Sequence, residues 1–470
     1  MPLTILPDSD VKKVLHSLTQ KDILDIQISL ADALHYYSTS TETEDNGCCA
    51  SYQPKRTSLK RKNGSTTLFM PATSNDAMGV KIVTLAEPKR PTWTDDASTS
   101  SLSVSSLSIS DSNSGSKQSS NPSLSSSTPL SPTAAEHHSS VSSQGLSPRA
   151  TTPKGSLTLL DRSGNPRALI NAEELTAFRT ALASTALFKK RANVHDLVVF
   201  GAGKQAYWHI RLALLLRGSD VHHLTIVNRS FERAQEMVSK LFKPDFPAVE
   251  LSHPKIVILT TGHGEYDRLL KETVRGASAI FTTTPSLSPL FPASYLTSTT
   301  ARVKGRYIAA IGSYKPHMIE LHPDVVRQAV APSHGHHHHK HAKSGGAVIV
   351  DSVEACMKEA GEIIQAGLDA HEVVELGELI MLKRDAEKKK AEDIRRDSES
   401  STDSGGVRFG GKRSTKGGKH GDDDGGLGEW LKKGNVIFKS VGIGLMDIVV
   451  GSEIVRLANE RGLGVHVESF

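Results

Sequence analysis

The sequence contains little cysteine, few aromatic residues and no long apolar run. Its three cysteines, Cys48, Cys49 and Cys356, fit neither a disulfide framework nor a zinc-binding spacing. Phe, Trp and Tyr together make up 5% of the 470 residues. No stretch approaches the roughly 20 apolar residues that a membrane-spanning helix needs, and the first residues lack the order of a signal peptide. We therefore expect a soluble, cytoplasmic protein with no resident metal and no membrane partner.

Hydrophobic residues are also scarce, at 37%, and the shortage is concentrated in biased tracts. Residues 91–153 are rich in Ser, Thr and Pro, and residues 383–428 are charged and then rich in Gly and Asp. Both tracts are expected to be disordered, because they cannot bury enough apolar surface. The loop 333–346 is rich in His, a common metal ligand, but a flexible insertion is the favoured interpretation. The net charge of +5 is spread along the chain, so no nucleic-acid partner is indicated.

The stretch 195–230 has the pattern of a strand, a helix and a second strand. Leu197–Phe200 is strand-like, the chain then turns at glycines, and residues 204–216 have a helical pattern. Gly201 permits a tight turn and Gly203 lets the backbone approach a pyrophosphate, whose charge the free N–H groups of a helix start would bind. The predicted cofactor residues here are Gly201, Ala202, Gly203, Lys204 and Gln205. The alternative is a tight strand-to-helix turn in another kind of α/β protein.

The end of the second strand bears on the choice of cofactor. NAD-binding sites usually place an acidic residue there, for the ribose 2′-hydroxyl. This chain has Asn228, Arg229 and Ser230 instead. An arginine beside a small hydroxyl suits a 2′-phosphate, so NADP(H) is favoured and NAD(H) remains possible. The alternative for Arg229 is a solvated loop residue.

The α/β alternation continues beyond Ser230. The pattern predicts helices at 231–242 and 266–274, one helix at 353–367, and strands at 255–260, 278–282, 306–311 and 347–350. This order indicates a parallel sheet covered on both faces. Thr283 and Ser313 follow two of these strands, where ligands gather in such sheets, and are candidate cofactor residues.

The flanking segments have a different character. An extended segment and two helices precede strands within 52–85, and a hairpin at 157–170 leads to a helix capped by Asn171. The last segment, 429–470, reads as a strand, a glycine turn and a closing helix.

Several segments together resemble the ornithine cyclodeaminase/mu-crystallin family. They are FMPATSNDAMGVKIVT, LTAFRTALAS, GAGKQAYWH, AAIGSYKPHMIELHPD, VDSVEACMKEAGEI, LGEL and NVIFKSVGIGLMD. The resemblance implies an α/β fold with a Rossmann NAD(P)-binding domain and an α+β substrate-binding domain built from both chain ends, through which the protein forms a homodimer. We place the Rossmann domain at 193–382. The second domain takes 1–90 and 154–192, completed by about 445–470.

The resemblance also assigns roles to individual residues. Arg56, Lys81 and Arg179 match positions that hold a substrate carboxylate, and the chemistry fits, since arginine offers a planar fork and lysine a point charge. Lys81 is the best candidate for the catalytic general acid. The turn formed by Ser440, Val441 and Gly442 resembles a segment that faces the nicotinamide.

The chain departs from the cyclodeaminase pattern at two positions. Leu68 and Tyr314 stand where ornithine cyclodeaminases carry acidic residues. Like this chain, the mu-crystallin branch, which reduces cyclic ketimines with NADPH, lacks both acids and has the arginine matched by Arg229. The sequence therefore predicts an NAD(P)H-dependent reductase of a small imino or amino acid. The alternatives are an ornithine cyclodeaminase or amino-acid dehydrogenase, and a non-catalytic NADPH-binding sensor.

Overall fold

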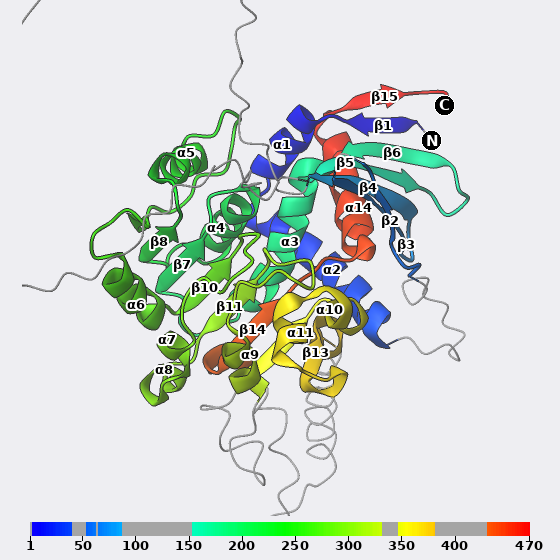
Figure 1. Cartoon of the computed structure of the whole chain (residues 1–470). Helices are drawn as coiled ribbons and strands as arrows, with labels where there is room; N and C mark the ends of the chain where they lie inside the picture. The colour runs from blue at the N-terminus through cyan, green and yellow to red at the C-terminus, as the bar shows by residue number, and fades with distance from the viewer. Residues whose placement is uncertain (1, 40–52, 63, 87–152, 331–345, 381–429) are drawn as a thin grey trace, which may run out of the picture. The chain divides into compact units, whose positions relative to one another are not determined.

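A computed structural model of the chain describes residues 2–39, 53–62, 64–86, 153–330, 346–380 and 430–470 (Figure 1). The tracts that we expect to be disordered fall almost entirely outside these ranges. None of the described helices is long and apolar enough to cross a membrane. The described residues belong to one compact unit, made of residues 1–86 and 152–470, which contains two sheets.

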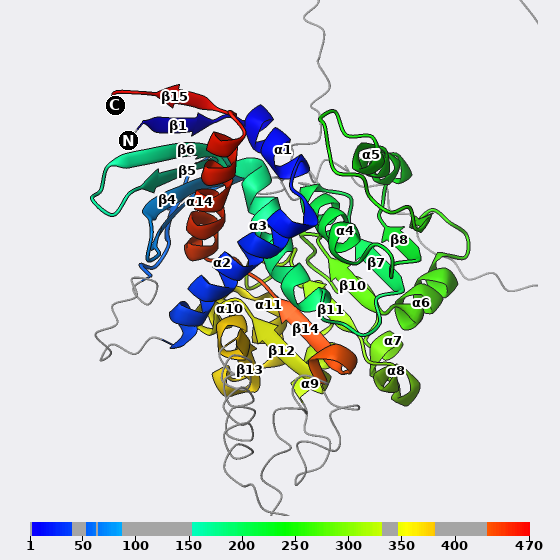
Figure 2. The same cartoon turned by 180° about the vertical axis from the view of Figure 1, so that it is seen from behind.

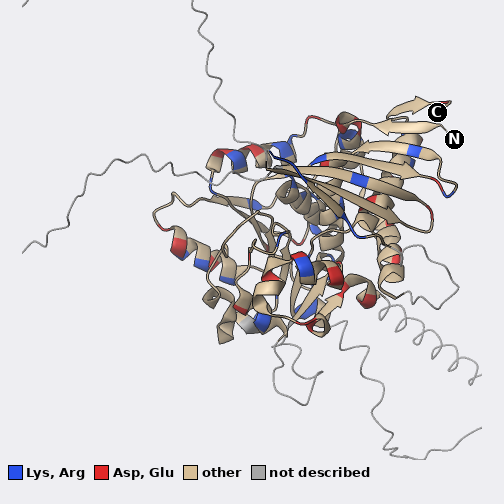
Figure 3. Ribbon diagram, turned by 45° about the vertical axis from the view of Figure 1, so that its right-hand side comes forward, with Lys and Arg blue, Asp and Glu red and all other residues tan. Residues whose placement is uncertain are grey.

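The larger sheet has eight strands, all parallel, in the order β13-β12-β14-β11-β10-β7-β8-β9. Its strands are β7 (Asp196–Phe200), β8 (His223–Val227), β9 (Lys255–Leu259), β10 (Ala279–Thr282), β11 (Tyr307–Ala310), β12 (Gly346–Val350), β13 (Val373–Glu375) and β14 (Asn435–Lys439). Successive residues of β7 face opposite cores, with Leu197 and Val199 on one side and Val198 and Phe200 on the other. These strands carry few charges (Figure 3). The predicted parallel sheet with two buried faces is thus confirmed.

Helices cover both faces of this sheet (Figure 2). They are α4 (Lys204–Arg217), α5 (Phe231–Phe242), α6 (Tyr266–Gly276), α7 (Ser294–Thr297), α8 (Thr299–Val303) and α9 (Pro323–Val330). Helix α4 packs on β7 and β10, and α6 packs on β7 and β9. The buried side chains of α4 belong to one core and those of α6 to the other, so these two helices lie on opposite faces.

One predicted helix is wrong. Residues 353–367 form two helices, α10 (Val353–Glu359) and α11 (Gly361–Ala366), followed by the short η2 (Ala370–Glu372). The break lies at Ala360, whose φ of −80° and ψ of 101° are extended. A Cβ on Gly361 would lie 1.8 Å from the carbonyl oxygen of Met318. Close packing of two backbone segments therefore overrides the helical pattern of this sequence.

The smaller sheet has seven strands, in the order β15-β1-β6-β5-β4-β3-β2. They are β1 (Leu3–Leu6), β2 (Thr57–Lys60), β3 (Ser65–Thr73), β4 (Met78–Ala86), β5 (Lys154–Leu160), β6 (Pro166–Asn171) and β15 (Val465–Val467). Strand β1 pairs in parallel with β6 and antiparallel with β15, so both chain ends enter this sheet. Its helices are α1 (Asp8–His16), α2 (Gln20–Thr39), α3 (Ala172–Phe188) and α14 (Gly444–Glu460). The predicted cap of α3 is confirmed, since the Asn171 side chain accepts a hydrogen bond from the Glu173 N–H.

The C-terminal segment takes part in both sheets. Strand β14 lies between β11 and β12, within the sheet that we expect from residues 193–382, and α14 then packs on β3, β4 and β5. Helix α3 packs on α4, and one core cluster contains residues from both sheets. The division into domains at residue 192 stays a prediction.

Candidate functional site

The parallel sheet brings most of the predicted cofactor residues to one edge. Its hydrogen-bond register places the last residues of neighbouring strands in a single row, namely Val227, Phe200, Thr282, Ala310, Lys439 and Val350. Gly201, Asn228, Thr283 and Ser440 directly follow four of these strands. The direction in which successive strands are added reverses at β7, because β8 lies on one side of β7 and β10 lies on the other. Open α/β sheets bind ligands at such a reversal, outside the carboxyl ends of the strands.

The glycine turn after β7 is shaped for close approach by a ligand. Gly201 has a φ of +110°, and its N–H donates to the Val227 carbonyl at 2.9 Å. A Cβ on Gly201 would lie 2.8 Å from Oγ1 of Thr283, which itself donates to the Phe200 carbonyl. At Gly203, just before α4, no heavy atom of the described residues, apart from Gly203 and its two chain neighbours, lies within 4 Å of the position of an added Cβ. These residues fit a dinucleotide, because a pyrophosphate would have room against the free N–H groups of α4.

The next two residues contribute in different ways. The Lys204 ammonium pairs with Glu173 at 2.9 Å and with Glu174, both on α3. Burial alone would lower the pKa of Lys204, but the two carboxylates raise it. Only the backbone of Lys204 is thus left for a phosphate. Oε1 of Gln205 is buried and has no hydrogen-bond partner among the described residues.

After β8, the structure leaves Arg229 available. The Asn228 amide donates to the Ser230 carbonyl at 2.7 Å, and the Ser230 hydroxyl caps α5 by accepting from the Arg233 N–H at 3.2 Å. Arg229 is exposed, and its guanidinium has no hydrogen bond or ion pair within the described part of the chain. Arg229 alone of the three predicted residues offers an uncommitted side chain.

Lys81 on β4 and Arg179 on α3 meet at a carboxylate. Nζ of Lys81 and Nε of Arg179 donate to the same Oδ1 of Asp447 on α14, at 2.8 and 3.1 Å. All three side chains are buried, and Oδ2 of Asp447 has no partner among the described residues. Burial lowers the pKa of Lys81 to about 8, against the attraction of Asp447. Two cations around one anion leave an excess positive charge, which suits a substrate carboxylate.

Arg56 lies apart from that shared carboxylate. Its Nε donates to Oε1 of Glu359 at 2.7 Å, and burial lowers its pKa. Its charge is nevertheless close enough to Lys81 to lower the pKa of the lysine. The structure therefore brings together two of the three predicted substrate residues and holds the third nearby in its own ion pair.

The turn at residues 440–442 connects the cofactor edge to the basic residues. The buried carboxylate of Asp351 accepts hydrogen bonds from the Ser440 hydroxyl at 2.6 Å and the Gly442 N–H at 2.7 Å. The Val441 N–H donates to the same carboxylate at 3.3 Å. Gly442 has a φ of +84°, and a Cβ there would lie 2.5 Å from Nη2 of Arg179. Asp351 thus fixes a turn whose tip touches the candidate substrate site.

Ser313 points into a buried network rather than toward open space. Its hydroxyl donates to Glu362 and accepts from Lys439, which pairs with Glu362 at 3.2 Å. Beside it, the carboxylate of Glu320 accepts from the N–H groups of Thr284 at 2.6 Å and Gly312 at 2.7 Å. Burial raises the pKa of Glu320 to about 7. This network supports the loops after β10 and β11.

Five acidic or basic residues of this region have no role in the sequence prediction. They are Asp351, Glu320, Glu362, Lys439 and Asp447. The sequence does contain a hint of these residues, namely charged side chains at apolar positions. Asp351 directly follows a predicted strand, and Asp447 lies near the start of an apolar helical pattern. Charged residues in such surroundings are rarely buried unless they have a partner. Their partners, however, are distant in sequence.

Known proteins resemble the chain in sequence and in fold. The sequence pattern of the ornithine cyclodeaminase/mu-crystallin family matches residues 151–381. Delta(1)-pyrroline-2-carboxylate reductase of Bacillus cereus is 27% identical over 67% of this chain and 75% of its own length. Ketimine reductase mu-crystallin of mouse is 27% identical over 48% of this chain, which spans 59% of the mouse protein.

The fold is shared with a solved enzyme. The structure of Thermococcus litoralis Delta(1)-pyrroline-2-carboxylate reductase, in complex with NADH and L-proline, superposes with a TM-score of 0.58. The superposition covers 99% of this chain and 100% of that one, at 17% identity. It confirms the predicted fold, a Rossmann domain with a second α+β domain.

Proposed function

Because the chain belongs to the ornithine cyclodeaminase/mu-crystallin family, we propose that it is an NAD(P)H-dependent oxidoreductase that reduces a cyclic ketimine or a related imino acid. One observation carries the proposal: the buried Lys81–Arg179–Asp447 cluster adjoins the turn at Gly442, beside the carboxyl-end edge of the parallel sheet. A site for an anionic substrate and a site for a dinucleotide thus lie next to each other. The Bacillus cereus and mouse relatives described above are named as reductases of substrates of this class.

The glycine turn and the first turn of α4 would hold the cofactor. Gly201, Gly203 and the backbone of Lys204 would receive the pyrophosphate, and Arg229 the 2′-phosphate of NADP(H). Thr283 and the turn held by Asp351 lie where the nicotinamide would be placed. When bound, this cofactor supplies the hydride. We propose NADP(H) as the preferred form and NAD(H) as the alternative.

The basic cluster would orient the substrate. The Arg179 guanidinium and the Lys81 ammonium would hold the carboxylate, with Arg56 exchanging Glu359 for the substrate. Reduction of a C=N bond places a hydride on carbon and a proton on nitrogen. Lys81 would give that proton, since its lowered pKa of about 8 lets it act as an acid near neutral pH.

An assay with purified full-length protein tests this function. NADPH and NADH are each supplied with Δ1-pyrroline-2-carboxylate or its six-membered homologue, and nucleotide oxidation is followed at 340 nm. We expect turnover that falls at least a hundredfold in Arg179→Met. Proline and ammonia from ornithine would identify a cyclodeaminase instead, although Leu68 and Tyr314 supply no carboxylate. Binding of NADPH without turnover of any of these substrates would leave the sensor alternative.

The cofactor preference has a test of its own. Replacement of Arg229 by Asp should repel a 2′-phosphate and accept a hydrogen bond from a 2′-hydroxyl, which shifts the NADPH/NADH ratio of kcat/KM at least tenfold toward NADH. Arg233→Asp, in the first turn of α5, serves as the control for charge alone. A wild-type preference for NADH would overturn the assignment of Arg229. The homodimer and the cytoplasmic location stay predictions.

A further inference from the structure

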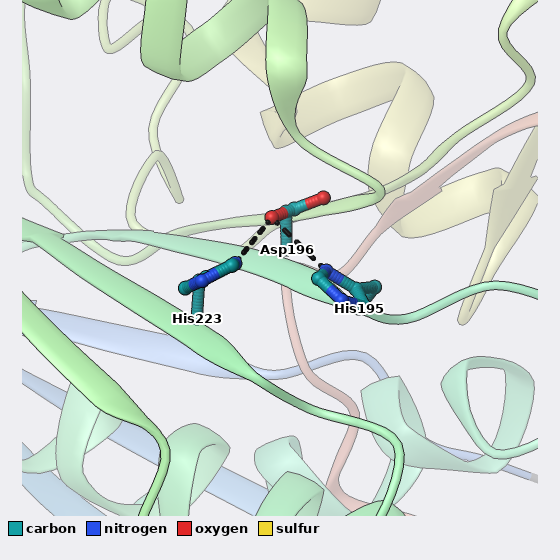
Figure 4. Close-up of side chains that lie close together, drawn as sticks. All are labelled: His195, Asp196 and His223. Atoms are coloured by element: carbon teal, nitrogen blue, oxygen red, sulfur yellow. Dashed lines mark hydrogen bonds and ion pairs between the residues drawn. The ribbon is translucent and has the colours of Figure 1, made fainter.

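A second group of titratable side chains lies at the opposite, amino-end edge of the eight-stranded sheet. His195 precedes β7, Asp196 is the first residue of β7, and His223 is the first residue of β8. Figure 4 shows both imidazole rings directed at the same carboxylate. We propose that these three side chains form a binding site for a divalent transition-metal ion of the Zn²⁺ type, separate from the candidate active site.

The spacing of the donor atoms is that of a metal site. Nδ1 of His195 lies 3.2 Å and Nδ1 of His223 lies 2.9 Å from the same Oδ1 of Asp196. All three donor atoms lie within 4.8 Å of one another. Ligands at zinc-bond lengths of about 2.0–2.2 Å, at the corners of a tetrahedron, are roughly 3.3 Å apart. An ion can therefore replace the present hydrogen bonds with small side-chain rotations.

The backbone holds the three residues in place. Asp196 and His223 are register partners in the β7–β8 pair. The His223 N–H donates to the His195 carbonyl at 3.1 Å, and the Ser278 N–H donates to the Asp196 carbonyl at 2.9 Å. Two donors are thus carried by strands and the third directly precedes one, which reduces the ordering that metal binding must impose.

The donor set selects the class of ion. Two imidazoles and one carboxylate suit Zn²⁺ and its neighbours, whereas Ca²⁺ and Mg²⁺ prefer sites made of oxygen alone. The side chains are 46%, 39% and 49% exposed, in chain order, so water can complete the coordination. Burial would raise the pKa of Asp196, but hydrogen bonds from His223 and His195 keep it low. The positive charge of Lys304 is close enough to help lower the pKa of Asp196, and it would oppose a bound cation.

The sequence did not indicate this site, and our expectation from sequence was that the protein has no resident metal. Asp196 and His223 are separated by a helix in the chain and become neighbours only through the parallel pairing of β7 and β8. The His-rich tract at 333–346 would have drawn attention first. Residues 333–345 of this tract lie outside the described residues, and the proposed site does not depend on them.

Zinc binding by the full-length protein tests the proposal. To remove competition, the six histidines of the His-rich tract are replaced by Asn in every protein compared, namely His334, His336, His337, His338, His339 and His341. Competition with a chromophoric chelator then gives the affinity and the stoichiometry. We expect one tight zinc equivalent that is weakened at least tenfold in His223→Asn and in Asp196→Asn. His371→Asn, in η2, is the matched control and should leave it unchanged.

Two further readouts keep the test decisive. Zinc should raise the thermal unfolding midpoint by a few degrees in the parent protein and not in Asp196→Asn, because a ligand stabilises only the state that binds it. A zinc-soaked crystal of the wild-type protein should show an anomalous peak between the two imidazoles. Equal zinc affinity in the parent and in His195→Asn/His223→Asn, or the absence of that peak, overturns the proposal.

Discussion

At the scale of single residues, Asp447 is central to the candidate substrate site. It is fully buried and places one oxygen against both Lys81 and Arg179. Two buried cations without an anion would repel each other and remain poorly solvated. Asp447 therefore makes it possible to keep both charges inside the protein before any substrate arrives.

Replacement of Asp447 by Asn should destabilise the protein by about 3 kcal/mol, since it leaves the two cations buried without their anion. Urea unfolding at pH 7 measures the change. Asp76→Asn is the control, because the Asp76–Arg162 pair is exposed and such pairs contribute little. Equal midpoints for the two variants would contradict the central role of Asp447.

The lowered pKa of Lys81 predicts a pH dependence. Below about pH 8 the free protein carries the proton that the imine nitrogen needs, and above it this proton is lost. We therefore expect kcat/KM for imine reduction to fall tenfold per pH unit above about pH 8. The Lys81→Arg variant has a side chain that stays charged, so its kcat/KM should be lower overall but should no longer fall above pH 8. An unchanged fall above pH 8 would assign the titration to another group.

The roles predicted for the site residues stay predictions, but the structure shows which side chains are already engaged. The glycines at 201 and 203 were identifiable because a turn of this kind needs them. The side chains of Lys204 and Ser313 were expected at the cofactor, yet Glu174 and Glu362 bind them. Those carboxylates are 30 and 49 residues away in sequence, so no local pattern reveals the pairing.

At the scale of elements, the turn from β7 into α4 contains two glycines, Gly201 and Gly203, which we expect to be there for different reasons. Gly201 has a left-handed backbone conformation and close neighbours, so the fold itself requires it. Gly203 has neither, because its φ is −102° and the space around it is open. Neither the backbone conformation nor the described neighbours of Gly203 require a glycine there. A pyrophosphate bound at this turn would require one, because a side chain would occupy its place.

Gly203→Ala should therefore leave the stability of the apo protein within about 0.5 kcal/mol of wild type and weaken NADPH binding at least tenfold. Thermal unfolding without cofactor and fluorescence titration with NADPH measure the two effects. Gly276→Ala is the matched control, since it also has open space around it, at the end of α6, far along the chain from the turn. Normal NADPH affinity in Gly203→Ala would place the pyrophosphate elsewhere.

Elements with a strong pattern were predictable, and those set by tertiary contacts were not. Helix α5 was expected at its observed bounds, 231–242, and the structure shows that the Ser230 side chain caps it. The break at Ala360 was not expected, since it results from the contact of Gly361 with Met318. Strand β15 was also missed, because its three residues are largely exposed and are strand only through pairing with β1.

At the scale of the whole molecule, the tract 87–153 is inserted between neighbouring strands. Thr84 of β4 and Lys154 of β5 are register partners, so the chain leaves and re-enters the sheet at nearly the same point. A short turn would span the same gap. The framework of the described unit therefore does not need the tract for its connectivity.

Replacement of residues 88–152 by a four-residue Gly-Asn turn should retain the fold and the reductase activity. The shorter connection should also stabilise the protein by about 2 kcal/mol, because closing a shorter loop costs less entropy. Urea unfolding and the imine assay on both proteins measure this. An insoluble or inactive product would show that the tract has a role within the folded unit.

The position of β14 has a consequence for synthesis. This strand is the last of its sheet to leave the ribosome, yet it lies between β11 and β12 rather than at an edge. A nascent chain that ends before residue 435 has β11 and β12 without the strand that joins them, and their apolar edges stay open. The sheet can close only after residues 435–439 have left the ribosome. A premature stop before residue 435 would thus remove an interior strand of this sheet, and such products should aggregate rather than form a smaller functional protein.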